Sequence, residues 1–356
     1  DSTLKNNHSI SSYGGAIWAN NAFIYKVDAS GNSAISGGAM KVNTRMDVAY
    51  STFSGNSSTN SGGAISTNEI IAHNCLFQEN TSEYAGAIAS TTATLVDSQV
   101  YKNTSIVTGS GVFASSKAII KGSELTYNTS GGSGGAVYSQ GEVYIYGSSL
   151  EFNNAAESGG AVCALGKLFI NYDYDGAKGT INTEYGRTII SRNVSMNDTT
   201  SRAYSGGLHS YGALIYNAEI TNNTAKDYGA GVLISNSDMV SIIKNSEISF
   251  NECTGIVNQD RSPRGGAGIY CHGSLEIDDC IISNNISTTV NGGGVFAGHY
   301  VPGDASYDAS KSLTIRNSEI RDNVAGNLRF NDTTEDFEDL IADTGNLTIR
   351  ENLSDD

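Results

Sequence analysis

Hydrophobic and polar positions follow one recurring phrase along this chain. A large apolar residue stands three positions before an Asn, and a turn later the sequence reads Gly-Gly-Ala followed by an apolar residue. Residues 4–7 lead to residues 14–17 in this way, and residues 53–56 lead to residues 62–65. In the first half of the chain the anchoring residues are Asn7, Asn32, Asn56, Asn80, Asn103, Asn128 and Asn153. This spacing of about 24 residues is typical of stacked repeats, so the pattern predicts a solenoid.

Two further patterns indicate that the repeat is built from β-strands. Apolar and polar residues alternate in segments such as residues 143–145 and 275–277, which is the period of a strand with one buried face. Sustained helical spacing of apolar residues is not seen. Small residues form a column two positions before the apolar residue of the phrase: Ser51, Cys75, Ser98, Ser123, Ser148, Ser246, Cys280 and Ser318. We therefore expect an all-β parallel β-helix, with two or three short strands per coil and coils about 4.8 Å apart.

The turn residues of the phrase predict how each coil bends. The Gly-Gly pair fits a bend that needs a positive φ and a close approach of the backbone. The Ala and the apolar residue that follow, such as Ala136 and Val137, are expected to point into a narrow interior. Asn suits the adjacent corner, because it tolerates a left-handed conformation and its amide can bond to the Asn above and below.

Beyond Asn153 the phrase continues at wider intervals, which predicts longer coils. It recurs as far as Asn323, and the whole chain then contains about twelve coils. Because no linker or break in composition interrupts the pattern, we expect a single β-helix domain over residues 1–356. Regular coils are expected in residues 1–165 and longer coils in residues 166–356. The candidate insertions are residues 171–188, 254–264, 297–312 and 327–345.

Composition narrows the partners and the compartment. A net charge of −16 argues against nucleic acid, because binding phosphates requires clustered Lys and Arg. No apolar run approaches the length that spans a bilayer, so no transmembrane segment is expected in this chain. The five Cys are interpreted as buried small residues, with a disulfide among Cys253, Cys271 and Cys280 as the alternative.

Asn-x-Ser/Thr sequons are frequent, as expected in a chain rich in Asn, Ser and Thr. Several fall on the repeat Asn, whose side chain should be occupied by its neighbours in the ladder. If the chain is a eukaryotic secreted protein, the better glycan acceptors are the sites away from the ladder: Asn197, Asn222, Asn331 and Asn346.

The paired phrases Gly-Gly-Ala-Ile/Leu/Val and Phe-x-x-Asn resemble the repeat of the polymorphic outer membrane proteins of chlamydiae, which have relatives in some protists. Residues 53–56 with 62–65 and residues 77–80 with 85–88 carry the resemblance, and other copies replace Phe by Leu, Ile or Val. The resemblance covers most of the chain. It implies a right-handed parallel β-helix, surface-exposed or secreted, often an autotransporter passenger, that acts in adhesion. Parallel crossovers usually have the same hand.

One local motif is a candidate metal site. Asn171, Asp173 and Asp175, followed by Gly176, match the first half of a calcium-binding loop, with oxygen ligands at alternate positions and then a Gly. The twelfth position holds Asn182 instead of Glu. The motif therefore predicts either a calcium site or a solvated acidic loop.

Catalysis is considered because many β-helices degrade polysaccharides. The candidate acids are Asp278 and Asp279, near His272 and Arg316. Ordinary surface charges are the favoured interpretation, since strand alternation turns one of the two Asp residues to solvent. The five His residues show no metal-binding spacing. We therefore do not expect an enzyme.

These observations favour a non-catalytic extracellular or cell-surface solenoid that acts in adhesion or surface interaction. Its partner would be a cell-surface glycan or protein, and residues 171–188 and 297–312 would be its contact loops, because departures from the repeat period have no structural necessity. Some tyrosines of the insertions either bind partners or fill gaps beside the solenoid: Tyr172, Tyr174, Tyr185, Tyr300 and Tyr307. The alternatives are a filament subunit that stacks end to end with copies of itself and a polysaccharide lyase or hydrolase.

Overall fold

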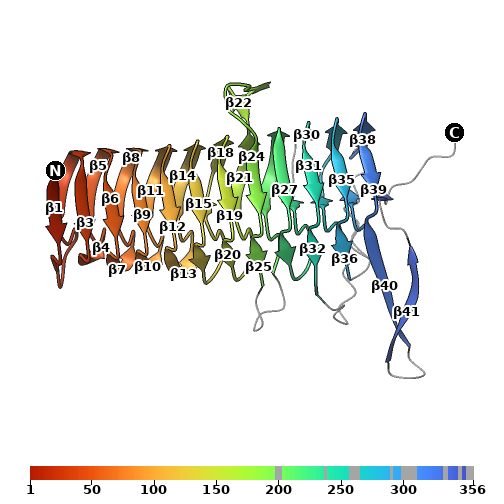
Figure 1. The fold of residues 1–356 in the computed structure, drawn as a ribbon, viewed down its shortest axis with the longest axis horizontal. Helices are drawn as coiled ribbons and strands as arrows, with labels where there is room; N and C mark the ends of the chain where they lie inside the picture. The colour runs from red at the N-terminus through yellow and green to blue at the C-terminus, as the bar shows by residue number, and fades with distance from the viewer. Residues whose placement is uncertain are drawn as a thin grey trace.

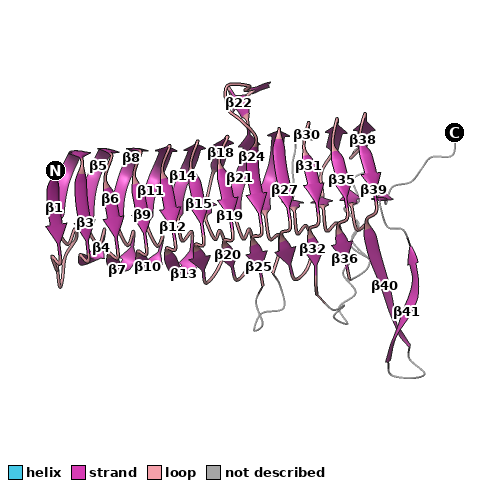
Figure 2. Ribbon diagram, in the orientation of Figure 1, coloured by secondary structure: helices cyan, strands magenta, loops and turns pink. Residues whose placement is uncertain are grey.

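The chain winds into a long parallel β-helix (Figure 1). In this computed structural model, the described residues are 1–196, 203–235, 239–255, 265–288, 292–297, 311–331, 336–343 and 347–349. They contain strands and turns, and no helix occurs among them (Figure 2). Successive coils lie side by side from the N-terminus to the C-terminus, so neighbours in space are about one repeat apart in sequence. The all-β solenoid expected from the sequence is confirmed.

Three sheets form the wall of the β-helix. Sheet A has twelve strands: β1 (Ser2–Lys5), β3 (Val27–Ser30), β6 (Thr52–Ser54), β9 (Leu76–Gln78), β12 (Gln99–Tyr101), β15 (Glu124–Thr126), β19 (Ser149–Glu151), β24 (Thr188–Ser191), β27 (Ala218–Thr221), β31 (Glu247–Ser249), β35 (Ile281–Ser283) and β39 (Glu319–Arg321). Sheet B also has twelve: β4 (Ser33–Ser36), β7 (Ser57–Ser61), β10 (Thr81–Tyr84), β13 (Thr104–Thr108), β16 (Thr129–Ser130), β20 (Asn154–Ala155), β25 (Val194–Ser195), β28 (Thr224–Ala225), β32 (Glu252–Cys253), β36 (Ile286–Ser287), β40 (Val324–Asn331) and β41 (Asp336–Asp343). The twelve strands of sheet A agree with the expected number of coils.

Sheet C is the widest wall and has sixteen strands, some of them divided by a bend at mid-strand. They are β2 (Ile17–Tyr25), β5 (Met40–Ala49), β8 (Ile65–His73), β11 (Ile88–Val96), β14 (Val112–Lys121), β17 (Val137–Ser139), β18 (Glu142–Tyr146), β21 (Val162–Ile170), β26 (Leu208–Tyr216), β29 (Val232–Ile234), β30 (Ser241–Lys244), β33 (Ile269–Cys271), β34 (Leu275–Asp278), β37 (Val295–Ala297), β38 (Leu313–Arg316) and β42 (Leu347–Ile349). All the pairings within sheet C are parallel.

Each corner between sheets is turned by a residue with a positive φ. Gly62, with φ 68°, turns from sheet B into sheet C, and a Cβ on the next residue, Gly63, would lie 2.1 Å from the carbonyl oxygen of Gly86. This contact explains why the phrase contains two glycines. Asp97, with φ 48°, turns from sheet C into sheet A, and Tyr127, with φ 58°, turns from sheet A into sheet B.

The repeat Asn residues form a continuous buried ladder beside that last corner. Asn56 is typical: its backbone N–H and Nδ2 both donate to Oδ1 of Asn80, at 2.9 and 3.0 Å, and its Nδ2 also donates to the carbonyl of Ala29. The ladder includes Asn7, Asn32, Asn56, Asn80, Asn103, Asn128, Asn153, Asn193, Asn223, Asn251, Asn285 and Asn323. The expected amide ladder is confirmed. The other reason given for Asn, that it tolerates a left-handed conformation, is wrong, because the residue before each ladder Asn carries the positive φ.

The columns of small and apolar residues stack in register. The backbone N–H of Ser123 donates to Oγ of Ser148 on the next coil at 3.1 Å. Ala136 and Ala161 are completely buried, and the rings of Phe53 and Phe77 stack with centroids 5.1 Å apart. The interior is therefore a continuous core along the axis, as the sequence predicted.

Departures from the coil occur in the second half. An antiparallel hairpin of β22 (Tyr172–Tyr174) and β23 (Gly179–Ile181) lies within the insertion at residues 171–188 (Figure 1). A second antiparallel hairpin, formed by β40 and β41, begins at Val324, before the insertion expected at residues 327–345, and ends within it at Asp343. Most of the insertions expected at residues 254–264 and 297–312 lies outside the described residues. The winding sense and the single-domain organisation stay predictions.

Candidate functional site

One column of side chains on the outer face of sheet C differs from coil to coil. Each strand opens with a residue that points inward, and the next residue points outward. The outward residues of successive strands pair in register along the sheet. They are Trp18, Lys41, Ser66, Ala89, Phe113, Tyr138, Cys163, His209, Leu233, Tyr270 and Phe296. We call this set the outer column. The register continues from Phe296 to Thr348 of β42. Small side chains lie in this set between Lys41 and Phe113, at Ser66 and Ala89, and again at Cys163.

The small residues leave a groove on the wall of the regular coils. Ser66 and Ala89 lie at its base, with 5% and 8% of their surfaces exposed. The groove has a volume of about 430 Å³ and crosses the coils of β5, β8, β11 and β14. Its lining contains one cation, Lys41, and no Asp or Glu. This is unusual on a chain with a net charge of −16.

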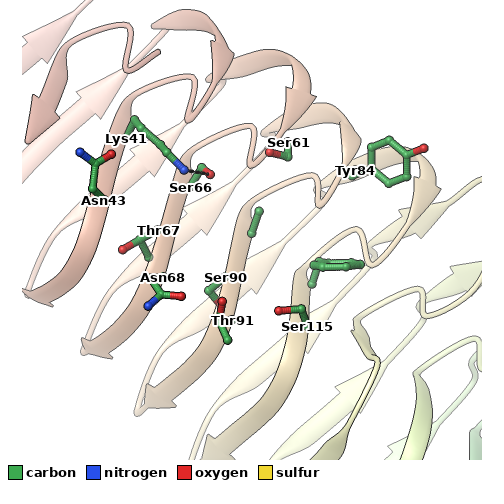
Figure 3. Close-up of a pocket in the computed structure, with 12 residues that line it drawn as sticks. Lys41, Asn43, Ser61, Ser66, Thr67, Asn68, Tyr84, Ser90, Thr91 and Ser115 are labelled. Carbon is green, nitrogen blue, oxygen red and sulfur yellow. Dashed lines mark hydrogen bonds between the residues drawn. The ribbon is translucent and has the colours of Figure 1, made fainter. Parts of the chain in front are cut away.

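Hydroxyl and amide side chains follow the mid-strand bend along one side of the groove. Figure 3 shows these side chains on successive strands, with Lys41 reaching toward Ser66: Asn43, Thr67, Asn68, Thr91 and Ser115. Asn43 is exposed, and its carboxamide bonds to Asn20 and Trp18 of the neighbouring coil. Asn68, Thr91 and Ser115 are also exposed, so their polar atoms can reach a ligand in the groove.

Two aromatic rings complete the lining. Tyr84, which is 39% exposed, lies on the other side of the groove from the polar side chains, as Figure 3 shows. Phe113 is part-exposed and stacks on Tyr138 with ring centroids 5.5 Å apart. A half-open groove with aromatic rings and convergent hydroxyl and amide groups can bind a flat apolar face that also carries polar substituents.

Toward the C-terminus the outer column is covered instead of open. Tyr204, Tyr228, Tyr270 and Phe296 stack successively at centroid distances of 4.7, 4.6 and 4.8 Å, and Phe296 is completely buried. His209 is held by Oγ of Ser158 at 2.7 Å and of Ser235 at 3.2 Å. Burial lowers the pKa of His209 to about 4, so the ring is neutral at pH 7.

The predicted calcium ligands lie in the first hairpin, and each has a protein partner. Asn171 is buried at a corner with φ 51°, where its Oδ1 accepts the N–H of Gly147. Asp173 accepts the hydroxyl of Tyr146 and the amide of Asn182. Oδ1 of Asp175 accepts the N–H of two following residues in the turn, and these bonds lower its pKa. No group of three or more His, Cys, Asp or Glu side chains in the described ranges could hold a metal, and calcium at Asn171 stays a prediction.

The tyrosines of this hairpin fill a gap beside the solenoid. Tyr172 is buried, and with Tyr144, Tyr146, Phe169 and Leu214 it forms a cluster outside the main core. Tyr174 and Tyr185 pack against the same cluster. The gap-filling interpretation is confirmed for these three residues, while Tyr300 and Tyr307 lie outside the described residues.

The candidate catalytic acids have different surroundings, and Asp279 lines a surface hollow of about 490 Å³ together with Glu247 and Glu319. Asp278 ends β34, where it pairs with Lys244 at 3.3 Å and accepts the amide of Asn317. The bond from Asn317, followed by that from Lys244, lowers the pKa of Asp278. Asp279 occupies a corner with φ 55°, and Arg316 lies 3.8 Å from Glu276. His272 bonds to its own strand neighbour, Tyr270.

The structure describes all five cysteines and two of the four candidate glycan acceptors, Asn222 and Asn331. All five thiols are buried and unpaired, which confirms the interpretation of Cys as small buried residues; Cys253, Cys271 and Cys280 form no disulfide here. Asn222 is exposed at the corner before Asn223. Asn331 ends β40, whereas Asn197 and Asn346 lie outside the described residues. Glycosylation stays a prediction.

The open groove was missed by the sequence reasoning, which located contacts in the insertions. Its signal is present in the sequence: the residue after Gly-Gly-Ala-apolar changes from Lys41 through Ser66 and Ala89 to Phe113. Reading that single position down the repeats identifies a small-residue gap between larger side chains.

The comparison with known families agrees with the repeat. Residues 50–68 match the Chlamydia polymorphic membrane protein repeat, a segment that contains Phe53, Asn56 and the Gly62-Gly63-Ala64-Ile65 turn. The chain therefore carries a repeat of this type, as expected from its sequence. No curated protein and no solved structure matches the chain.

Proposed function

We propose that this chain, which carries the polymorphic membrane protein repeat, is a non-catalytic cell-surface or extracellular β-helix that acts in adhesion or surface interaction. The observation that supports the proposal most is the open groove on sheet C, where the outer column is reduced to Ser66 and Ala89. A half-open groove along several coils suits an extended ligand, because each coil adds a further set of contacts.

The location at the surface rests on the repeat. The matched family is named for membrane proteins, and the remaining copies of the phrase extend the same architecture over the described coils. No helix in the described parts of the chain is long and apolar enough to cross a membrane.

The non-catalytic part of the proposal rests on the chemistry of the acids. A general acid needs a pKa near the working pH, which for a carboxyl group means a raised pKa. The hydrogen bond from Asn317 and the ion pair with Lys244 instead lower the pKa of Asp278. The groove contains no carboxylate. Both observations favour binding over hydrolysis of a polysaccharide.

Adhesion of coated beads to cultured cells tests this function. Beads that carry the purified chain should adhere, and the Ala89→Trp variant should lose adhesion because the indole fills the groove. Thr52→Trp, a matched change at a part-exposed position of sheet A, should leave adhesion unchanged. Adhesion that survives Ala89→Trp but is lost on deletion of residues 173–186 would move the contact to the first hairpin.

Two other outcomes would replace the proposal. Cleavage of a polysaccharide by the purified chain, stopped by Asp278→Asn, would establish an enzyme. Concentration-dependent filaments in electron micrographs, without adhesion of the beads, would establish a structural subunit.

A further inference from the structure

The charge of the groove distinguishes it from the rest of the wall. Some cations of the regular coils pair with acids: Arg45 lies 3.0 Å from Asp47 and 3.2 Å from Glu69, and Lys117 lies 3.4 Å from Glu142. Others lie over tyrosine rings, namely Lys26, Lys102 and Lys121. In the described residues, no carboxylate lies within ion-pair distance of the Nζ of Lys41, the one cation that lines the groove. Its ammonium donates instead to Oγ of Ser66 at 3.0 Å. An ammonium has three donors, so at least one N–H remains directed to the groove or to solvent.

The partly buried position of Lys41 strengthens the attraction between its ammonium group and an anion in the groove. The side chain is part-buried beside Ser66, and burial lowers its pKa from the ordinary value. A partly desolvated cation attracts an anion more strongly than an exposed one, because less of the interaction is screened by water. An anionic group placed here would meet no repulsion from the lining, which has no Asp or Glu.

The aromatic, hydroxyl and amide side chains of the groove indicate which kind of molecule bears the anionic group. Part-exposed Phe113 and exposed Tyr84 present ring faces or edges of the kind on which apolar faces pack. Exposed Asn68, Thr91 and Ser115 offer both donors and acceptors at intervals along the coils. A pyranose ring has one apolar face and a rim of hydroxyl groups, so a sugar chain fits this combination better than a peptide side chain or an isolated anion.

We propose that the groove binds a glycan whose sugars bear a carboxylate, with Lys41 on the carboxylate, Phe113 and Tyr84 against the sugar rings, and the hydroxyl and amide row on the sugar hydroxyls. This inference rests on the proposed function and names the class of partner for the same groove.

Isothermal titration calorimetry with matched sugars tests it. The probes are a trigalacturonate, its methyl ester and a sulfated disaccharide. The trigalacturonate should bind, and the neutral ester should bind at least about tenfold more weakly, as expected for loss of a charged hydrogen bond. Lys41→Gln should weaken trigalacturonate binding by about the same factor and leave the ester unaffected, and Lys41→Arg should restore it. Lys117→Gln, on the same sheet, is the matched control.

The outcomes separate this inference from the adhesion function. Equal binding of acid and ester, or full affinity in Lys41→Gln, overturns the carboxylate assignment. Tight binding of the sulfated sugar alone replaces the carboxylate by a sulfate. If no sugar binds while beads still adhere through the groove, the glycan is wrong and the adhesion proposal stands. If adhesion is also unchanged in Ala89→Trp, the groove is not the contact surface, and both the glycan and the assignment of adhesion to the groove fail. Thermal melting of each variant confirms that it is folded.

Discussion

The regular coils and the longer coils share one interior but have different outer walls. The Asn ladder runs through both, with coils separated by as few as 23 residues between Asn80 and Asn103 and by as many as 40 between Asn153 and Asn193. On the outer face of sheet C, Ser66 and Ala89 leave an open groove in the first half, whereas Tyr270 and Phe296 are buried in the second. The repeat therefore determines the core, and the residues outside it determine what each stretch of wall can contact.

The strongest test of this difference compares two outer-column aromatics. Phe296→Ala should lower the free energy of unfolding by about 4 kcal/mol, because the ring is completely buried and stacks on Tyr270. Phe113→Ala should cost about 1 kcal/mol, since its ring is part-exposed at the groove. Urea titrations of both variants measure the two values. Similar costs would mean that the outer wall is packed alike in both halves.

Because the interior is shared, the loss of a ladder Asn should lower the free energy of unfolding equally in the regular coils and in the longer coils. Asn128→Ala should destabilise the fold by about 3 kcal/mol, because the backbone N–H and Nδ2 of buried Asn103 both lose their acceptor and Oδ1 of Asn153 loses one of its two donors. Asn251→Ala should cost the same within about 1 kcal/mol, as its bonds to Asn223 and Asn285 are equivalent. Denaturant unfolding of the two variants measures this. A much smaller cost for Asn251→Ala would show that the ladder does not hold the longer coils together.

The covered wall should respond to acid. Because the pKa of part-buried His209 is about 4 in the folded chain and near 6.5 in the unfolded chain, the unfolded state binds the proton first as the pH falls. Stability should therefore drop by about 2 kcal/mol between pH 7 and pH 5, and the loss should level off below pH 4. Unfolding titrations at several pH values measure the slope. His209→Gln should remove this component, and an unchanged slope in that variant would assign the effect to other groups.

The smallest effect is expected at an exposed corner of the regular coils. Phe152 adopts φ 56° and stacks on Tyr127 at 4.9 Å, while the same corner holds Asn222 and Asn284 in later coils. Phe152→Asn should change the free energy of unfolding by less than about 1 kcal/mol, because relief of backbone strain offsets the lost stacking. The matched change Leu150→Asn, at a completely buried position, should be far more costly in the same assay.

The sequence was sufficient for the parts of the fold that repeat. Ser123 and Ser148, Ala136 and Ala161 lie in their predicted columns, because stacking forces equivalent residues into equivalent environments. It was insufficient where one side chain has several physically reasonable partners. Asn171 fits a calcium motif in the sequence, yet in the structure its amide joins backbone groups at a corner. The groove depends on the difference in side-chain volume between equivalent positions of neighbouring coils. Neither the repeat motif nor the lengths of the insertions contain that difference.

The Asn ladder has a consequence for how such a chain changes over generations. Each rung requires only the Asn of the next coil and a backbone carbonyl, whatever length of chain lies between. Unequal recombination between two copies of the phrase therefore deletes or duplicates a whole coil and leaves an intact ladder. The length of the rod, and the position of any groove along it, can then diversify by single genetic events without a new core having to be selected.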